Sequence, residues 1–383
     1  MRDTATAVVD TLGNGRVSVA NAGPVWTDAD AWVAEEDLRI GTLEGEGPDQ
    51  FGEIIALTVD KQGRIYVLDY LSQDIRVFEA DGSYSHTMGG PGEGPGELMR
   101  AAGLNWGPGG NLWVWDPGGR FSIFTPDGDF VDMRPRKVRG TLYPWRGEFD
   151  VDGTLIDWGL EYPRPTAETR APRPSRVIYY PVRLSGDFAI GDTLPTLEFG
   201  FEMTDDGERM LFGEILSSFQ DRKGAFWFAH NKTFTVYRRT LEGDTTLQFS
   251  MPATPASVTE RDVDSVRAVY IEQGRPERAP APNAFAATKP MIRRIFSDEL
   301  GHIFVLSELE GRPLGTFVDV FRDSGRYLGR VDLPTPVSFP YPPPFATDTH
   351  LFYITTDEFD VGYVVRVRLH KPVLQPDRDG SSP

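Results

Sequence analysis

Residues 63–69 read GRIYVLD, and residues 110–116 read GNLWVWD. Gly110 follows Gly63 by 47 residues, and each segment runs from a glycine through apolar residues to an aspartate. The same interval carries GEGP at 45–48 onto GEGP at 92–95. Self-similarity with a period of about 40 to 50 residues is typical of β-propeller blades. The repeat therefore predicts an all-β protein in which one small sheet is copied around a ring.

Each repeat predicts a blade of four antiparallel strands. The turn before residue 63 has the form D-x-x-G, and Asp81-Gly82 and Asp127-Gly128 mark later tight turns. The stretch GGPGEGPGEL at 89–98 has neither the lysine of a phosphate-binding loop nor a G-x-G-x-x-G frame. We expect it to be the crossover from the outer strand of one blade to the inner strand of the next.

Weaker copies of the unit start near Asp150, Asp221, Asp298 and His350, which brings the number of blades to six. The last copy has no room for an outer strand. Moving the outer strand of the first full blade back by one period places it on residues 38–42, so we expect an N-terminal strand to close the ring.

The spacing of the repeats also predicts the domain organisation. We expect an N-terminal extension over 1–37, a single propeller over 38–370 and a C-terminal tail over 371–383. Longer spacings predict insertions at about 158–215 and 253–289. The second insertion contains one helix, which Thr259 would cap with Asp262 reaching back to it.

Composition excludes several classes of function. The formal charge of −18 disfavours nucleic acid as a partner, and no apolar stretch is long enough to be a transmembrane segment. The absence of cysteine removes thiolate metal sites and cysteine nucleophiles. The polar start of the chain fits a protein whose export leader was removed. We therefore expect a periplasmic or extracellular location, with any membrane association through a partner or a removed lipid anchor.

The repeat pattern D-x-x-G-x-I-Y-V-x-D, then I-x-V-F-x-x-D-G, then G-x-G-x-G-P-G-E, resembles that of NHL-type six-bladed β-propellers. It is particularly similar to the exported or lipid-anchored propellers of environmental bacteria. Residues 38–132 carry the pattern strongly and residues 133–370 carry it diffusely. The resemblance implies an architecture and no single activity, because such propellers range from interaction platforms to lactone hydrolases and lyases.

In a propeller the inner strands line a central channel, where ligands usually bind. The repeat places six charged residues near the starts of the inner strands, and they could bind a polar or anionic small molecule. These candidates are Glu53, Arg100, Arg146, Glu148, Glu214 and Arg293. The alternative is that they pair with one another and fill the channel.

The segment DVDGTLID at 150–157 matches the signature of haloacid-dehalogenase-type phosphatases. In a phosphatase of this type, Asp150 would be the nucleophile, Asp152 would be the general acid and base, and both would help to hold Mg²⁺. The octet also falls where the repeat requires a blade hairpin, with Gly153 equivalent to Gly63. We predict the hairpin.

Four aromatic residues of the expected insertions are candidates for a protein-docking surface, namely Phe199, Phe201, Tyr270 and Phe285. The alternative is that they cover the blades locally. We predict a propeller without catalytic residues, metal or cofactor that binds another protein or a small polar ligand. The alternative function is a lactonase-like hydrolase or a lyase at the channel mouth, for which Ca²⁺ would be the candidate cofactor.

Overall fold

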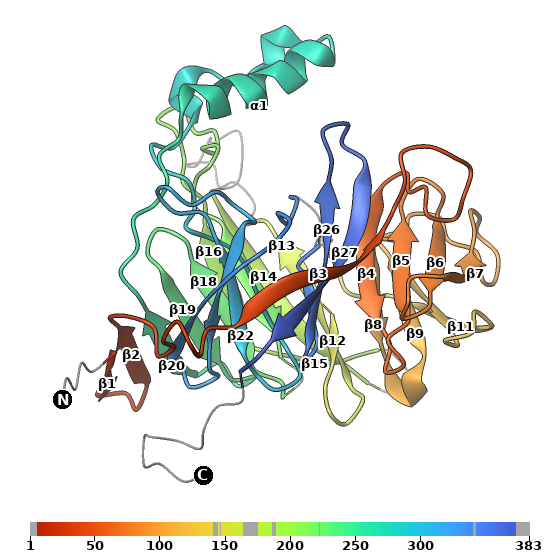
Figure 1. Cartoon of the computed structure of the whole chain (residues 1–383), viewed down its shortest axis with the longest axis horizontal. Helices are drawn as coiled ribbons and strands as arrows, with labels where there is room; N and C mark the ends of the chain where they lie inside the picture. Colours follow the sequence, from red (N-terminus) through yellow and green to blue (C-terminus); the bar gives the residue numbers. More distant parts are fainter. Residues whose placement is uncertain are drawn as a thin grey trace.

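Six β-sheets surround a common axis, and each sheet is one blade (Figure 1). The computed structural model describes residues 6–140, 145, 147–163, 175–185, 189–221, 223–339 and 342–372. Within each blade the strands lie side by side from an inner strand at the axis to an outer strand at the rim, and neighbouring strands are antiparallel except where one N-terminal strand is added to blade 4. The prediction of a six-bladed propeller with one helix is confirmed.

The strands of the blades follow the chain in order. Blade 1 contains β4 (Ile54–Val59), β5 (Ile65–Asp69), β6 (Asp74–Phe78) and β7 (Tyr84–Gly89). Blade 2 contains β8 (Gly103–Trp106), β9 (Leu112–Asp116), β10 (Arg120–Phe124) and β11 (Phe130–Pro135). Blade 3 contains β12 (Glu148–Phe149), β13 (Leu155–Glu161) and β14 (Arg176–Leu184), and both β15 (Ile190–Thr193) and β16 (Leu197–Gly200) pair with β14.

The remaining blades complete the ring. Blade 4 contains β17 (Leu216–Gln220), β18 (Phe226–His230), β19 (Thr235–Arg239) and β20 (Thr245–Ser250). Blade 5 contains β21 (Ile292–Ser297), β22 (Ile303–Ser307), β23 (Phe317–Phe321) and β24 (Tyr327–Asp332). Blade 6 contains β25 (Phe345–Ala346), β26 (His350–Thr356), β27 (Gly362–His370) and β3 (Val33–Ile40).

The hydrophobic core lies between neighbouring blades. One cluster joins Tyr66 and Leu68 of β5 to Leu112 and Val114 of β9, and all four side chains are fully buried. Alternation of side chains along a strand sends these residues to the faces of the sheet, where the next blade covers them. Burial of each such apolar side chain contributes about 1.5–3 kcal/mol, so the blades stabilise one another.

The crossover from β7 to β8 is a loop held by its own hydrogen bonds. The amide of Gly92 donates to the carbonyl of Leu98 (2.9 Å), and the amide of Leu98 donates to the carbonyl of Gly90 (2.7 Å). Gly96 has a φ of 81°, which favours glycine. Leu98 is buried and anchors the loop to the core. The glycine-rich stretch is the predicted interblade crossover.

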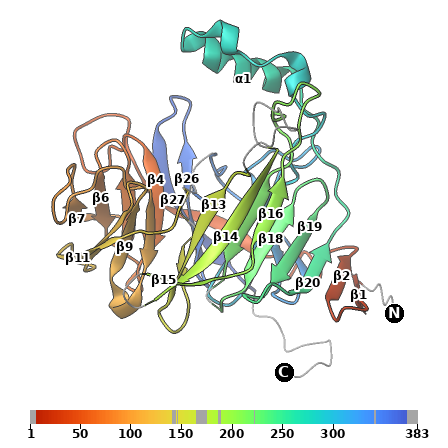
Figure 2. The ribbon, with the colours of Figure 1, turned by 180° about the vertical axis from the view of Figure 1, so that it is seen from behind.

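An N-terminal strand closes the ring as predicted, although this strand, β3, spans Val33–Ile40 and not the expected residues 38–42. It pairs antiparallel with β27, with Ile40 opposite Val364 and Val33 opposite His370. Two further strands precede it, β1 (Ala7–Thr11) and β2 (Val17–Asn21), and they form a hairpin. Strand β2 adds in parallel to β20, so blade 4 has two extra strands (Figure 2). No repeat marks this hairpin in the sequence.

Helix α1 (Glu260–Glu272) stands beyond the ends of the strands in both views (Figures 1 and 2). Thr259 caps it, and its hydroxyl accepts the amide of Asp262 while the Asp262 carboxylate accepts the amide of Thr259. This confirms the predicted cap. The helix buries none of its residues. Within the described ranges given above, no helix is long and apolar enough to cross a bilayer.

Candidate functional site: the central channel

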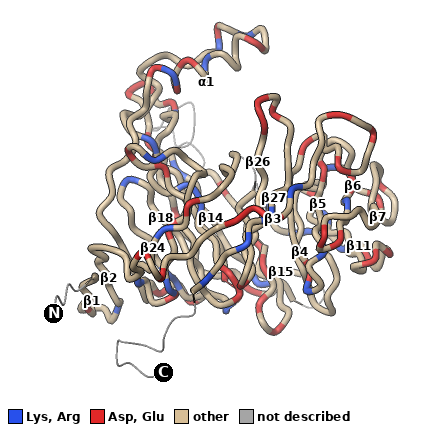
Figure 3. Tube along the Cα trace, in the orientation of Figure 1, with Lys and Arg blue, Asp and Glu red and all other residues tan. Residues whose placement is uncertain are grey.

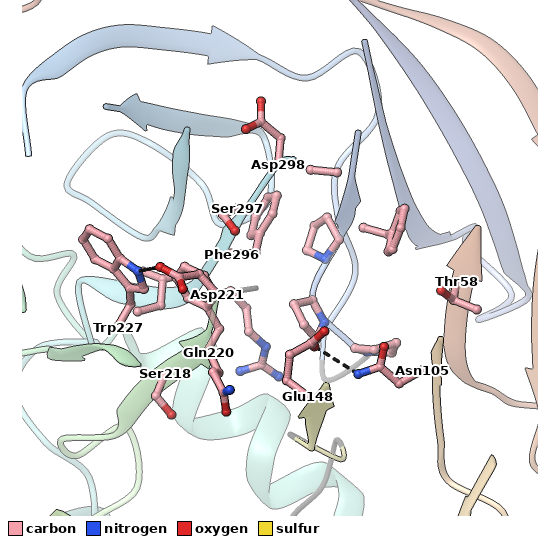
Figure 4. Close-up of a pocket in the computed structure, with 18 of the residues that line it drawn as sticks. Thr58, Asn105, Glu148, Ser218, Gln220, Asp221, Trp227, Phe296, Ser297 and Asp298 are labelled. Carbon is pink, nitrogen blue, oxygen red and sulfur yellow. Dashed lines mark hydrogen bonds between the residues drawn. The ribbon is translucent and has the colours of Figure 1, made fainter. Parts of the chain in front are cut away.

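The inner strands of all six blades line a channel with a volume of about 330 Å³ (Figure 4). Inner strands β4, β8, β12, β17, β21 and β25 each contribute residues to its wall. We name its two ends by the chain: the crossover end, where the inner strands begin, and the hairpin end, where they finish. A concave site lined by several elements is where a small ligand is expected to bind.

Gln220, the last residue of β17, is the polar residue of the channel with the most unusual surroundings. Its side chain is 8% exposed, yet neither atom of its carboxamide has a hydrogen-bond partner among the residues that the structure describes. A buried polar group without a partner costs about 1–3 kcal/mol. Because Gln220 lines the channel, a bound molecule could supply the missing hydrogen bonds.

Glu148 lies in the neighbouring blade and is held in place by Asn105. The side-chain amide of Asn105 donates to the Glu148 carboxylate (3.0 Å) and to the carbonyl of Gly147 (2.8 Å). The amide of Trp106 donates to the Asn105 side-chain oxygen (2.8 Å), which fixes the orientation of Asn105. Figure 4 shows Glu148, Asn105 and Gln220 around the same opening. Glu148 is thus a carboxylate with a defined position in the channel wall.

Arg294 of β21 brings a positive charge to the channel wall. Its guanidinium donates to the carbonyl of Arg293 (3.1 Å) and lies 5.4 Å from the centre of the Phe339 ring. The ring of Phe339 also lies 5.7 Å from the guanidinium of Arg293. Contacts with an aromatic face favour a cation in a partly desolvated place.

The rest of the wall is mixed, and it includes six further charged residues of blades 4 and 5, namely Asp221, Lys223, Arg238, Asp298, Glu299 and Asp323. In blade 6 the segment Pro342–Pro344 and Phe345 face the channel, and Phe296 of β21 and Ala56 of β4 add further apolar surface. Proline fixes its own backbone angle, so this part of the wall is stiff. The channel therefore has a polar arc, from blade 3 through blade 4 to blade 5, and an apolar arc in blades 6 and 1.

The structure separates the six charged residues predicted for this site. Glu148 lines the channel, and Arg146 lies outside the described residues. Glu53 and Arg100 are exposed in the crossovers before β4 and β8. Their backbone amides donate to the carboxylates of Asp69 and Asp116, at 3.0 and 3.3 Å.

The other two predicted residues lie at the crossover end and have local partners. Glu214 lies 3.4 Å from the imidazole of His230. Arg293 is 3.9 Å from Glu308, and burial lowers the pKa of its guanidinium from the ordinary arginine value. Neither residue lines the channel.

Gln220, Ser218 and Arg294 line the channel and were not predicted from the sequence. A bulge at Ile292–Arg294 leaves Arg293 out of the pairing between β21 and β22, and Arg294 lines the channel. For Ser218 and Gln220 a signal was available: residues two apart on an inner strand face the same side.

The four aromatic residues predicted for a docking surface differ in exposure. Phe199 (2% exposed) and Phe285 (8% exposed) are buried, so their rings are not available to a partner. Phe201 is partly exposed, and the Arg209 guanidinium lies 3.6 Å from the centre of its ring. Tyr270 is partly exposed on α1.

Asp150 lies in a blade hairpin, as predicted. One oxygen of its carboxylate accepts the amides of Asp152 (3.0 Å) and Thr154 (2.9 Å). Asp60 and Asp221 make the same pair of bonds in blades 1 and 4. The surrounding strands are antiparallel, whereas a phosphatase of this signature needs a parallel sheet with helices. Among the described residues no group of three histidine or acidic side chains could hold a metal ion.

Comparison with known proteins supports the architecture. Residues 43–105, which span blade 1 and most of the first strand of blade 2, match a family described as 6-bladed beta-propeller. Among curated proteins, no sequence matches the chain.

Solved structures with the same arrangement include two proteins from Bacteroides. A presumed exported protein of Bacteroides fragilis is 12% identical, with 92% of this chain and 100% of that chain covered and a TM-score of 0.52. A member of the duf4221 family from Bacteroides vulgatus is 11% identical, with 90% and 99% covered and a TM-score of 0.54. At these identities the likeness shows the fold alone.

A virginiamycin B lyase from Staphylococcus aureus, crystallised with quinupristin, is 12% identical over 89% of this chain and 100% of that chain. Its TM-score is 0.45, and at that value its activity cannot be carried over to this chain.

Proposed function

We propose that this propeller is a non-catalytic binding protein that holds a small polar molecule in its central channel. The observation that carries the proposal is Gln220, a buried carboxamide of the channel wall without a hydrogen-bond partner in the described part of the chain. Glu148 and Arg294 line the same channel, together with six further charged residues of blades 4 and 5, so the wall carries charges of both signs. Three kinds of polar group on one wall support recognition of a polar ligand.

We extend the proposal to a location outside the cytoplasm, as is presumed for the Bacteroides fragilis propeller. Detection of the protein in cytoplasmic, envelope and culture fractions of the organism that produces it tests this part. Recovery in the cytoplasmic fraction alone would reject the location and leave the binding proposal unaffected.

The binding proposal is tested by a thermal-shift screen with three sets of probes: the common amino acids, neutral sugars and small organic acids. The Gln220→Met variant keeps the size of the side chain and removes the carboxamide. Because a buried group without a partner is destabilising, we expect this variant to be about 1 kcal/mol more stable than the parent without ligand. We also expect it to lose most of the stabilisation that a bound probe gives the parent.

The matched control is Gln62→Met, at an exposed position outside the channel, which should change neither property. Equal stabilisation of the parent and Gln220→Met by the same probe would reject the channel as the binding site. NMR spectroscopy of each bound probe, and of a simple lactone, tests the non-catalytic part. Conversion of any of them by the purified protein would favour the hydrolase or lyase alternative.

A further inference from the structure

Resting on the proposed function, we infer that the channel ligand is a neutral monosaccharide that packs one face of its ring against phenylalanine side chains. One level of the channel wall carries this inference. Each inner strand has one residue that lies opposite the second residue of the next strand, or the third in blade 6, and all six of these residues line the channel. We call them the register level: Thr58, Asn105, Glu148, Phe219, Phe296 and Phe345.

The register level has two different halves. Blades 1 to 3 supply a hydroxyl, a carboxamide and a carboxylate, from Thr58, Asn105 and Glu148, and blades 4 to 6 supply three phenyl rings. Figure 4 shows Thr58, Asn105 and Glu148 on one side of the opening and Phe296 on the other. A ligand that matches this level has hydrogen-bonding groups on one side and an apolar surface on another.

A sugar ring combines these two properties. Hydroxyl groups lie around its edge and both donate and accept hydrogen bonds, and C–H groups cover its faces. The face of an aromatic ring carries partial negative charge and attracts weakly positive C–H groups. Phe219 and Phe345 are partly exposed, so a sugar face can pack on them while its hydroxyls reach the polar half of the register level.

Gln220 follows Phe219 on β17 and adds a neutral group. Both polar atoms of its carboxamide are buried without a hydrogen bond among the residues that the structure describes. A carboxamide offers a donor and an acceptor side by side. Two neighbouring hydroxyls of a sugar match this pair, because one can donate to the Gln220 oxygen while the other accepts from its nitrogen.

The charged residues at the hairpin end of the channel have partners in the protein. Lys223 lies 3.7 Å from Asp323. The carboxylate of Asp298 lies 2.7 Å from the imidazole of His302 and 3.6 Å from Lys371. These groups do not need a charged ligand to balance them.

The other charged residues of the wall are engaged as well. The carboxylate of Asp221 accepts the indole N–H of Trp227 (2.8 Å), and the guanidinium of Arg238 lies 5.7 Å from the centre of the Trp227 ring. Three more residues of the wall interact with other residues, namely Glu148, Glu299 and Arg294. Transfer of a charged ligand into a partly buried site is unfavourable unless an unpaired opposite charge meets it, so this wall favours a neutral ligand.

Long-range charge disfavours an anionic sugar in particular. Among the described residues, the wall holds five acidic and three basic side chains. The protein carries a formal charge of −18, and acidic side chains lie on loops all around it (Figure 3). An anion is therefore repelled as it approaches the channel.

Size and rigidity set a further limit. A volume of about 330 Å³ is close to the lower end of the range for ligand pockets, which runs from roughly 300 to 1,000 Å³, so a single sugar unit suits the channel better than a chain of several. Asn105 fixes Glu148, and the ring of Phe219 stacks on that of Trp227 with 6.2 Å between the ring centres. Groups that are fixed before binding lose little entropy when the ligand binds.

The test is isothermal titration calorimetry with D-glucose, D-galactose and D-mannose, each compared with its alditol and its uronate. The alditol carries the hydroxyls on an open chain, and the uronate has the same ring with a carboxylate. We expect at least one hexose to bind at least about tenfold more tightly than both of its relatives. The alditol lacks the fixed C–H face and loses more conformational entropy, and the uronate brings an unpaired charge.

Two variants test the two halves of the register level. Phe219→Leu removes a phenyl face and keeps an apolar side chain, and Thr58→Val removes a hydroxyl and keeps the shape. We expect each variant to weaken hexose binding about fivefold. The matched controls are Phe130→Leu and Thr87→Val, at exposed positions of blades 2 and 1 outside the channel, and they should bind as the parent does.

Saturation-transfer NMR separates a role in recognition from a role in structure. Saturation of aromatic protons of the protein should reach the C–H protons of the bound hexose, and Phe219→Leu should lower this transfer at equal occupancy. A residue with only a structural role would weaken binding and leave the pattern of transfer among the sugar protons unchanged.

Different results overturn different claims. If an amino acid, an organic acid or uracil, a neutral ring without hydroxyls, binds and Gln220→Met abolishes that binding, while no hexose binds, the sugar inference is wrong and the proposed function stands. If a hexose binds but its alditol or uronate binds equally well, or Phe219→Leu has no effect, the packing of the sugar on the register level is wrong. If none of these probes binds, the proposed function itself is wrong.

Discussion

Asp319 is the residue whose ionisation should affect stability most clearly. Its side chain is fully buried in blade 5, and burial raises its pKa to about 6. The tyrosine hydroxyl of Tyr327 donates to it at 2.7 Å, and the hydroxyl of Ser307 lies at 3.3 Å. Because the folded pKa lies above the unfolded value of about 3.9, folding favours the protonated carboxyl.

The sign of the pH effect follows from that raised pKa. The stabilising contribution of Asp319 is complete below about pH 4 and is lost as the pH rises through about 6. An asparagine side chain would imitate the protonated form, so the Asp319→Asn variant should not lose stability as the pH rises. The difference in free energy of unfolding between this variant and the parent should be about 3 kcal/mol larger, in favour of the variant, at pH 7.5 than at pH 4. Urea unfolding at both pH values measures this, with Asp323→Asn, an exposed residue between β23 and β24 of the same blade, as the control. Identical pH dependence of parent and Asp319→Asn would show that the carboxyl titrates normally.

Individual residues also show where prediction from the sequence stops. The aspartates that end GRIYVLD and GNLWVWD are predictable, because their role is local: Asp69 accepts the amides of Gly52 and Glu53 just before the inner strand. Arg294 was missed, although the repeat offered a signal: β4 has the same bulge, and Ala56, which like Arg294 lies seven residues before the hairpin glycine, also lines the channel. Glu148 was found because it falls on a regular strand start, and Gln220 was missed because charged residues alone were considered.

Among the larger elements, the crossover from β7 to β8 is tied to blade 2 by one arginine, in addition to its own hydrogen bonds. The guanidinium of Arg120 donates to the carbonyls of Gly92 (3.2 Å), Glu93 (2.8 Å) and Glu97 (3.0 Å). We expect Arg120→Gln to lower the free energy of unfolding by about 1–3 kcal/mol, because carbonyls would lose charged donors. Urea unfolding measures the loss, and hydrogen exchange should show faster exchange at Gly92 and Leu98. Arg176→Gln, which loses only an exposed pair with Glu198, should have little effect.

The helical segment depends on a single lysine at the crossover end. Lys289 lies 2.7 Å from Asp262 of α1 and 2.8 Å from Glu308, so it joins the helix to blade 5. The helix α1 buries none of its residues, and among the described residues backbone hydrogen bonds hold only the segment just before it, from Val258 to Ala287 and from Lys289 to Ala256. We expect Lys289→Met to increase tryptic cleavage at Arg261 and Arg267 several-fold, with almost no change in melting temperature.

The control for this prediction is Lys232→Met, which removes an exposed pair with Glu202 (3.2 Å) and leaves α1 in place. Cleavage at the parent rate in Lys289→Met would show that other contacts hold the helix.

For the molecule as a whole, a period of 47 residues was enough to predict six blades and a ring closed by the N-terminal strand. Each blade is too small to be stable alone, so the repeat must continue until the sheets close on themselves. The hairpin of β1 and β2 could not be predicted in this way, because it copies no blade and its parallel pairing with β20 depends on distant residues. The content of the channel is also a property of the whole ring, since its wall combines residues from six separate strands.

Ring closure leads to a prediction about truncation. Removal of residues 1–40 deletes β3 and leaves β27 as an open edge in blade 6, where Ile40 also packs in the core between blades 6 and 1. Removal of residues 1–22 deletes only β1 and β2 from the rim of blade 4. We expect the longer truncation to lose cooperative unfolding and to aggregate, because an open sheet edge pairs with other chains. We expect the shorter truncation to unfold cooperatively, at a urea concentration modestly lower than the full chain requires. Urea unfolding and size-exclusion chromatography measure both properties.

A synthetic peptide of residues 30–42 should restore cooperative unfolding to the longer truncation. Equal behaviour of the two truncations would mean that β3 does not hold the ring together.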